Sequence, residues 1–129
     1  MHKRFLSVGA ALGAIAVSLG AFGAHGLKQI ISPADVTVFQ TGVQYQMYHT
    51  LALMLVAIVY DRLPNKWIVW AGYFFSLGVI FFSGSLYLIT ALKAAERAVP
   101  VMIGILTPLG GLLFILGWLC FLAGIIRKN

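Results

Sequence analysis

The sequence has little charge and almost no cysteine, and these two deficits exclude whole classes of protein. Only 9% of its 129 residues are charged, whereas an ordinary soluble domain has about 25%. Cys120 is the only cysteine, so an internal disulfide and a metal site built from several cysteines are both excluded. With 61% hydrophobic residues and a mean hydropathy of +0.98, the chain is predicted to be an integral membrane protein.

The chain also lacks the patterns that would indicate nucleic-acid binding or a familiar chemistry. Its net charge is +6, but the basic residues stand at the ends of apolar segments, without a basic stripe or interleaved aromatic residues. They indicate membrane topology and contacts with anionic lipid head groups. No nucleophile–base–acid set, phosphate-binding loop or dinucleotide fingerprint is present. No nucleic-acid partner and no cofactor are therefore expected.

Clusters of charge divide the chain into four apolar segments, each long enough to cross about 30 Å of hydrocarbon. We therefore predict an all-α, polytopic membrane protein, a four-transmembrane-helix bundle in which residues 1–129 form a single membrane domain. The spans are expected at about 5–24, 43–60, 67–92 and 99–126. These spans contain no acidic residue, which argues against an ion-coupled transporter. The first segment also has features of a signal peptide, but its apolar run is longer than usual, so we expect a retained helix.

The longest connection, residues 25–44, contains the signals of a helix start. Ser32 is suited to cap a helix, Pro33 fits the first helical position, and Asp35 favours the positive helix end. The apolar residues that follow on one face are Val36, Phe39 and Val43. We expect a short interfacial helix here, leading from the first span towards the second.

An even number of spans puts both termini on one side of the membrane. That side would hold six of the nine basic residues: Lys3, Arg4, Arg62, Lys66, Arg127 and Lys128. The other three are Lys28, Lys93 and Arg97. Because positive charge marks the cytoplasmic side, we predict that both termini are cytoplasmic.

Small residues indicate where the helices pack against each other. In lipid, apolar side chains gain little by leaving lipid for protein, so close packing depends on small residues that let backbones approach. The first span is the richest in them and is expected at the centre of the packing. The glycines assigned to helix contacts are Gly9, Gly13 and Gly20 in the first span, and Gly110, Gly117 and Gly124 in the fourth. Gly9 and Gly13 also form a GxxxG pair, for which packing within one chain is favoured over dimerisation.

Polar side chains are expensive inside a bilayer, so their positions are the best indication of a site. The residues predicted to line one polar pocket in the outer half of the membrane are His25, Tyr45, Tyr48, His49, Ser83, Tyr87 and Thr107. His25 and His49 are expected to approach each other there. They would bind a metal, relay a proton or hold a polar head group, or else only hydrogen-bond neighbouring groups. The last is favoured and no metal is assigned, because zinc sites use three or four protein ligands.

Four segments carry a family resemblance. They read GAFGAHGL at 20–27, YQMYHTLAL at 45–53, FSGSLY at 82–87 and TPLGG at 107–111. Over nearly its whole length the chain resembles the YgdD/YwdK-like family of small bacterial inner-membrane proteins. That family is classed as a domain of unknown function and is similar to the eukaryotic transmembrane protein 256 family. The resemblance implies a four-helix protein of the bacterial plasma membrane, and it brings no activity, substrate or cofactor.

Three functions fit these observations. The first is an accessory or assembly component that packs against another membrane protein or a second copy of itself. The second is a binding or transport module for a lipid, quinone or other amphiphile, which would use the outer polar pocket. The third is a membrane enzyme that depends on the two histidines. We favour them in that order, because the polar groups can be satisfied without any ligand.

Overall fold

The computed structural model describes residues 2–127, and within that part every regular element is helical. The elements are α1 (Lys3–Ala24), the short 3₁₀ turn η1 (Leu27–Gln29), α2 (Pro33–Val59), α3 (Lys66–Gly78), the π-helical segment η2 (Val79–Ser83), α4 (Gly84–Ala94) and α5 (Val101–Ile126). Because α3, η2 and α4 follow one another without a break, the described chain has four helices long and apolar enough to cross a membrane. This confirms the predicted class of four-span helical membrane protein.

The helices begin at residues whose side chains satisfy free backbone N–H groups. At the start of α2, the Ser32 hydroxyl accepts a hydrogen bond from the Asp35 N–H at 3.2 Å. At the start of α3, the Asn65 side-chain oxygen accepts from the N–H groups of Trp67 and Ile68 at 3.0 and 3.2 Å. The Asn65 amide also donates to the Gly124 carbonyl at 3.0 Å, which fastens the start of α3 to the end of α5.

The structure corrects the expectation of a short interfacial helix leading to the second span. The helix that begins after Ser32 continues without a break to Val59, so it is the first part of α2. Val36 and Phe39 are buried inside the bundle instead of lying on the membrane surface. A salt bridge of 2.7 Å between Asp35 and Lys93 holds this end of α2 against the end of α4. The separate short element between α1 and α2 is the turn η1.

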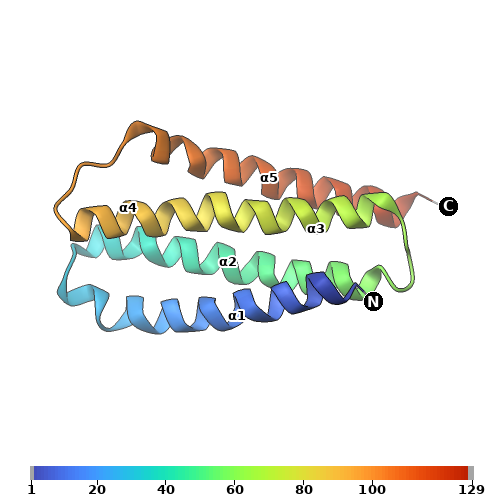
Figure 1. The fold of residues 1–129 in the computed structure, drawn as a ribbon, viewed down its shortest axis with the longest axis horizontal. Helices are drawn as coiled ribbons and strands as arrows, with labels where there is room; N and C mark the ends of the chain where they lie inside the picture. The colour runs from blue at the N-terminus through green and yellow to red at the C-terminus, as the bar shows by residue number, and fades with distance from the viewer. Residues whose placement is uncertain (1, 128–129) are drawn as a thin grey trace.

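The helices pack in the order α1, α2, α3–α4 and α5, and both termini lie at the same end of the bundle (Figure 1). Of the most apolar stretch of each helix, only 17% is buried in α1 but 50% in α2. The expected central position of the first span is therefore wrong: α1 lies at the edge. Its glycines occupy one face, and that single face packs on α2.

The predicted glycines all lie at contacts between helices of the same chain. In α1, Gly9 faces Met54, Gly13 faces Thr50 and Gly20 faces Val43, all on α2. In α5, the three glycines spaced by seven face the α3–η2 helix: Gly110 lies against Phe82, Gly117 against Phe75 and Gly124 against Ile68. A side chain at Gly110 would overlap the backbone of Phe82, so the two helix backbones approach closely there. At Gly9, Gly117 and Gly124 an added side chain would instead overlap the neighbouring side chains that fill the space beside each glycine.

A π-helical segment interrupts the third span, which the sequence predicts as one uniform helix. In this segment the Gly84 N–H reaches the Val79 carbonyl, five residues back. Its backbone lies directly against Gly110 of α5 at Phe82. The Ser83 hydroxyl donates to the Gly42 carbonyl of α2 at 2.6 Å. The segment η2 therefore contacts both neighbours of the third span, α2 and α5.

Candidate functional site

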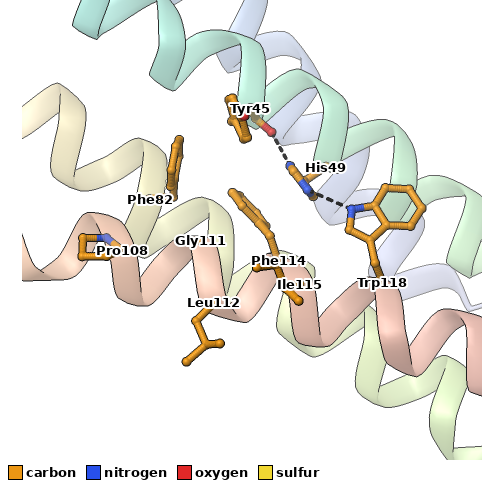
Figure 2. Close-up of a pocket in the computed structure, with 9 residues that line it drawn as sticks. All are labelled: Tyr45, His49, Phe82, Pro108, Gly111, Leu112, Phe114, Ile115 and Trp118. Carbon is orange, nitrogen blue, oxygen red and sulfur yellow. Dashed lines mark hydrogen bonds between the residues drawn. The ribbon is translucent and has the colours of Figure 1, made fainter.

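His49 lies at the junction of α2 and α5 and is 5% exposed. Its Nδ1 lies 2.8 Å from the Tyr45 carbonyl, and its Nε2 lies 3.2 Å from the Trp118 indole nitrogen (Figure 2). The imidazole is stacked on the Phe114 ring, with 3.5 Å between the ring centroids and 8° between the planes. Two hydrogen bonds and one stacked ring thus hold the side chain in a single orientation.

These two bonds determine the protonation of the imidazole. A carbonyl only accepts and an indole N–H only donates, so Nδ1 carries the proton and Nε2 offers its lone pair to Trp118. The ring is therefore neutral and both of its nitrogens are engaged. Metal ligation or proton transfer at Nε2 would require Trp118 to give up its hydrogen bond.

The structure does not bring His25 and His49 together. His25 is exposed at the end of α1, where its Nδ1 is 3.0 Å from the Ala21 carbonyl. Because Gly13 of α1 faces Thr50 of α2, His49 lies level with the middle of α1. That level is about eleven residues from His25, or about 16 Å along the helix at 1.5 Å per residue.

The other predicted polar residues are divided between separate places. Ser83 bonds to the Gly42 carbonyl, as described above. The Ser85 hydroxyl donates to the Phe82 carbonyl at 2.8 Å, so Thr107 donates to Ser85 across 2.6 Å. This pair joins α4 to α5 one residue before Pro108. The expected single polar pocket is therefore a set of hydrogen bonds between helices.

One of these connections joins three helices. It is formed by Tyr87 and by Gln46, a residue absent from the predicted set. Gln46 is 2% exposed; its amide donates to the Leu12 carbonyl at 2.8 Å and its oxygen accepts from the Tyr87 hydroxyl at 2.7 Å. One side chain thus links α1, α2 and α4. Its signal in the sequence is an amide in the middle of a span, three residues before His49. Trp118 carries no comparable signal, because its partner is 69 residues away.

Tyr45 and Tyr48 are neighbours one turn apart on α2, with 5.9 Å between their ring centroids. Tyr48 is 56% exposed. Tyr45 is 40% exposed, and its ring centroid lies 4.7 Å from that of Phe82. Within residues 2–127 neither hydroxyl has a hydrogen-bond partner. Both tyrosines thus present a polar atom on the outside of the bundle near the middle of a span.

A groove of about 660 Å³ separates α2 from α5 at this point (Figure 2). Its aromatic wall consists of Tyr45, His49, Phe82, Phe114 and Trp118. The remaining lining residues all belong to α5 and are Pro108, Gly111, Leu112 and Ile115. Gly111 has no side chain to fill the space, since an added Cβ would meet only the Phe82 ring at an ordinary 3.9 Å. The groove is mainly apolar and lies between the middle parts of two spanning helices.

The donor set does not suit a metal ion. Within the described residues, His, Cys, Asp and Glu form no group of three or more that could hold one. His49 is surrounded by aromatic rings, and Cys120 lies partly buried on α5. A zinc site uses three or four such ligands in one place. The groove is therefore suited to apolar and aromatic contacts.

Comparison with known proteins is consistent with this membrane-spanning fold. Residues 19–111 match the family described as "Protein of unknown function (DUF423)". The chain is 39% identical to the membrane protein YwdK of Bacillus subtilis, over 97% of this chain and 98% of YwdK. It is 40% identical to the inner membrane protein YgdD of Escherichia coli K12, over 98% of this chain and 93% of YgdD. No solved structure matches the chain.

Proposed function

The chain belongs to the DUF423 family of membrane proteins of unknown function, and on that premise we propose that it is a binding module for the hydrocarbon part of an amphiphile. The observation that carries this proposal is the aromatic groove between α2 and α5. Its volume of about 660 Å³ is within the range of about 300–1,000 Å³ that is typical of small-molecule sites. Its walls offer large rigid rings that make extensive contact with an apolar chain.

The position of the groove favours a ligand that resides in the bilayer. The lining residues of α5, from Pro108 to Trp118, lie in the interior of a 26-residue apolar helix. A void at this depth forfeits the dispersion contacts of its walls, so an acyl or polyprenyl chain that fills it is stabilised. The Tyr45 hydroxyl provides a hydrogen-bond donor for a polar oxygen of the same molecule.

The bonding of His49 supports binding rather than catalysis. Its two nitrogens are already paired with Tyr45 and Trp118, and its ring is covered by Phe114. A general base needs a nitrogen within reach of the proton that it removes. In this proposal His49 is a rigid part of the groove wall, and the histidine-dependent enzyme is not favoured.

We expect that the protein, purified under mild conditions and exchanged through detergent, retains one amphiphile. Gly111→Leu places a side chain in the groove and should abolish this retention. Gly104→Leu is the matched control, because Gly104 is on the same helix with open space around it. Native mass spectrometry and analysis of the extracted lipids measure the outcome. The proposal would be refuted if the wild type, Gly111→Leu and Gly104→Leu all retained lipids of the same composition as the bulk membrane.

A second candidate function, an accessory component for another membrane protein, is favoured by the outward face of α1. The exposed small residues on this face, at alternating spacings of four and three, are Ser7, Ala11, Ala14, Ser18 and Ala21. Such a face allows a further helix to approach closely, whether from another protein or from a second copy. The same mass spectra distinguish the two functions, because a heteromeric or dimeric mass without a small adduct supports the accessory function.

We further propose that both termini are cytoplasmic. The support is the excess of basic residues at the end of the bundle where the chain begins and ends, together with the rule that positive charge stays inside.

A further inference from the structure

A second pocket, at the end of the bundle where both termini lie, has a chemical character opposite to that of the groove. It has a volume of about 300 Å³ and is lined by His2, Lys3, Arg4, Tyr60 and Tyr73. These residues come from the start of α1, the end of α2 and the middle of α3. The lining contains two cationic side chains, two phenol hydroxyls and no acid.

The residues around this pocket are held in place by contacts with the bundle. The His2 N–H donates to the Ala57 carbonyl of α2 at 3.0 Å. The His2 ring is stacked on Phe5 at 4.1 Å between centroids, and its edge meets Tyr60 at 5.4 Å. Phe5 in turn meets the edge of the Tyr73 ring at 5.3 Å. The pocket is therefore a feature of the packed fold and not of a loose terminus.

The polar groups of the pocket are available to a ligand. Within residues 2–127, neither Lys3 nor Arg4 takes part in an ion pair, and both are exposed. Asp61, which follows Tyr60, already has an interaction of its own. The pocket thus combines an excess of positive charge with unused donors.

The pocket lies near the ends of the spanning helices α1 and α2, where the head-group layer of a bilayer is expected. Lys3 and Arg4 directly precede the apolar run of α1, where basic residues meet lipid head groups. Tyr60 and Tyr73 are of the residue type that prefers the membrane interface, and Tyr73 is half exposed beside Phe5. An amphiphile bound here would place its charge on the basic residues and its chains along the apolar surface of α1 and α3.

We propose that this pocket binds the phosphate of an anionic phospholipid. Arg4 presents a planar set of donors that matches phosphate oxygens, and Lys3 supplies a second positive charge. Tyr60 and Tyr73 also line the pocket, and each carries a hydroxyl that can donate a hydrogen bond. This site is independent of the groove between α2 and α5, and either one can fail without the other.

The test is lipid binding by the purified full chain in detergent, followed by native mass spectrometry with added phosphatidylglycerol or phosphatidylcholine. We expect phosphatidylglycerol to be retained preferentially. The double variant K3Q/R4Q should weaken that binding by about tenfold or more, because two charge-assisted contacts are lost. The matched control is R62Q/K66Q, which removes the same charge at the same end of the bundle but outside the pocket. It should change binding by less than about twofold.

A further variant and a competitor keep the test decisive. Tyr73→Phe leaves every charge in place and should weaken phosphatidylglycerol binding by about threefold, because one hydrogen bond is lost. Inorganic phosphate at millimolar concentration should not displace the lipid. Equal losses in K3Q/R4Q and R62Q/K66Q, or equal binding of the two lipids, would overturn the proposal. Displacement by inorganic phosphate would assign the pocket to a soluble anion instead.

Discussion

His49 joins α2 to α5 because it donates one hydrogen bond and accepts another. It donates to its own helix at Tyr45 and accepts from α5 at Trp118. A protonated ring would point a second N–H at the indole N–H, so the neutral form is the one that fits this position. The cross-link lies beside the groove, which means that it also holds the two walls of the groove at a fixed separation.

We predict that Trp118→Phe destabilises the protein by about 1–3 kcal/mol, because it leaves the buried His49 nitrogen without a partner while an aromatic ring is kept. Thermal unfolding in detergent micelles measures the effect. Trp70→Phe is the control, since Trp70 is 53% exposed and its ring lies beside those of Tyr73 and Phe74 on its own helix. Equal stability of Trp118→Phe and the wild type would show that the hydrogen bond contributes nothing.

The pairing of polar side chains within the bundle cannot be predicted from the sequence. The sequence marks polar side chains in apolar segments, since each is costly in lipid. It does not say which of them meet, because a partner depends on the rotation and depth of a second helix. Gln46 is the clearest case: its partners on α1 and α4 lie 34 and 41 residues away. His25 and His49 both lie in segments that carry the family resemblance, but they do not contact each other.

Among the helical elements, the third span shows how glycine and a π-helical segment act together. Phe82 lies within the segment Val79–Ser83, and its backbone fits directly against α5 because Gly110 has no side chain there. π-Helical turns are frequently found at functional sites, and Phe82 of this segment forms part of the groove wall. The local distortion of one helix therefore helps to shape the space between two others.

We predict that Gly110→Ala destabilises the protein by about 1–3 kcal/mol, because the added Cβ overlaps the Phe82 backbone, which cannot move aside easily. Gly104→Ala on the same helix should instead be neutral or stabilise by up to about 1 kcal/mol, since it meets no neighbour and alanine favours helix. Unfolding of both variants in the same detergent gives the comparison. A Gly110→Ala protein as stable as Gly104→Ala would contradict the close contact.

The arrangement of the whole bundle differs from the one that the distribution of small residues predicts. Such residues concentrate in α1, yet α1 is the least buried helix and α2 is the most buried. The reason is that the glycines of α1 allow close packing on one face only, the face against α2. Helix α2, in contrast, carries side chains that reach α1 on one side and α3–α4 and α5 on the other. The outer face of α1 is left for lipid or for a further helix.

The proposed orientation predicts the behaviour of fusion proteins made in bacteria. A fluorescent protein fused to the C-terminus should fluoresce, and alkaline phosphatase fused there should be inactive, because the first folds in the cytoplasm and the second outside it. Phosphatase fused after Arg97, in the loop at the opposite end of the bundle, should be active. The reverse pattern at both positions would contradict the prediction from basic residues.

The four spans are readable from the chain alone because crossing a bilayer is a local requirement. A run of apolar residues of sufficient length, bounded by charge, meets that requirement whatever its neighbours are. The helix start at Ser32 and Pro33 is local in the same way, and the structure contains it. Its continuation into α2 was not readable, because Val36 and Phe39 fit a membrane surface as well as a protein interior.

Only the tertiary structure decided which helix lies at the edge, which polar groups pair and where a groove remains open. Each of these depends on how far two helices are rotated and displaced relative to each other. A shift of one residue turns a helix by about 100°, which moves a side chain from a contact to the lipid. The apolar spacing in α5, for example, does not reveal that Gly110 faces Phe82 closely while Gly111 leaves a space beside it. That difference between two adjacent glycines separates a packed contact from the candidate site.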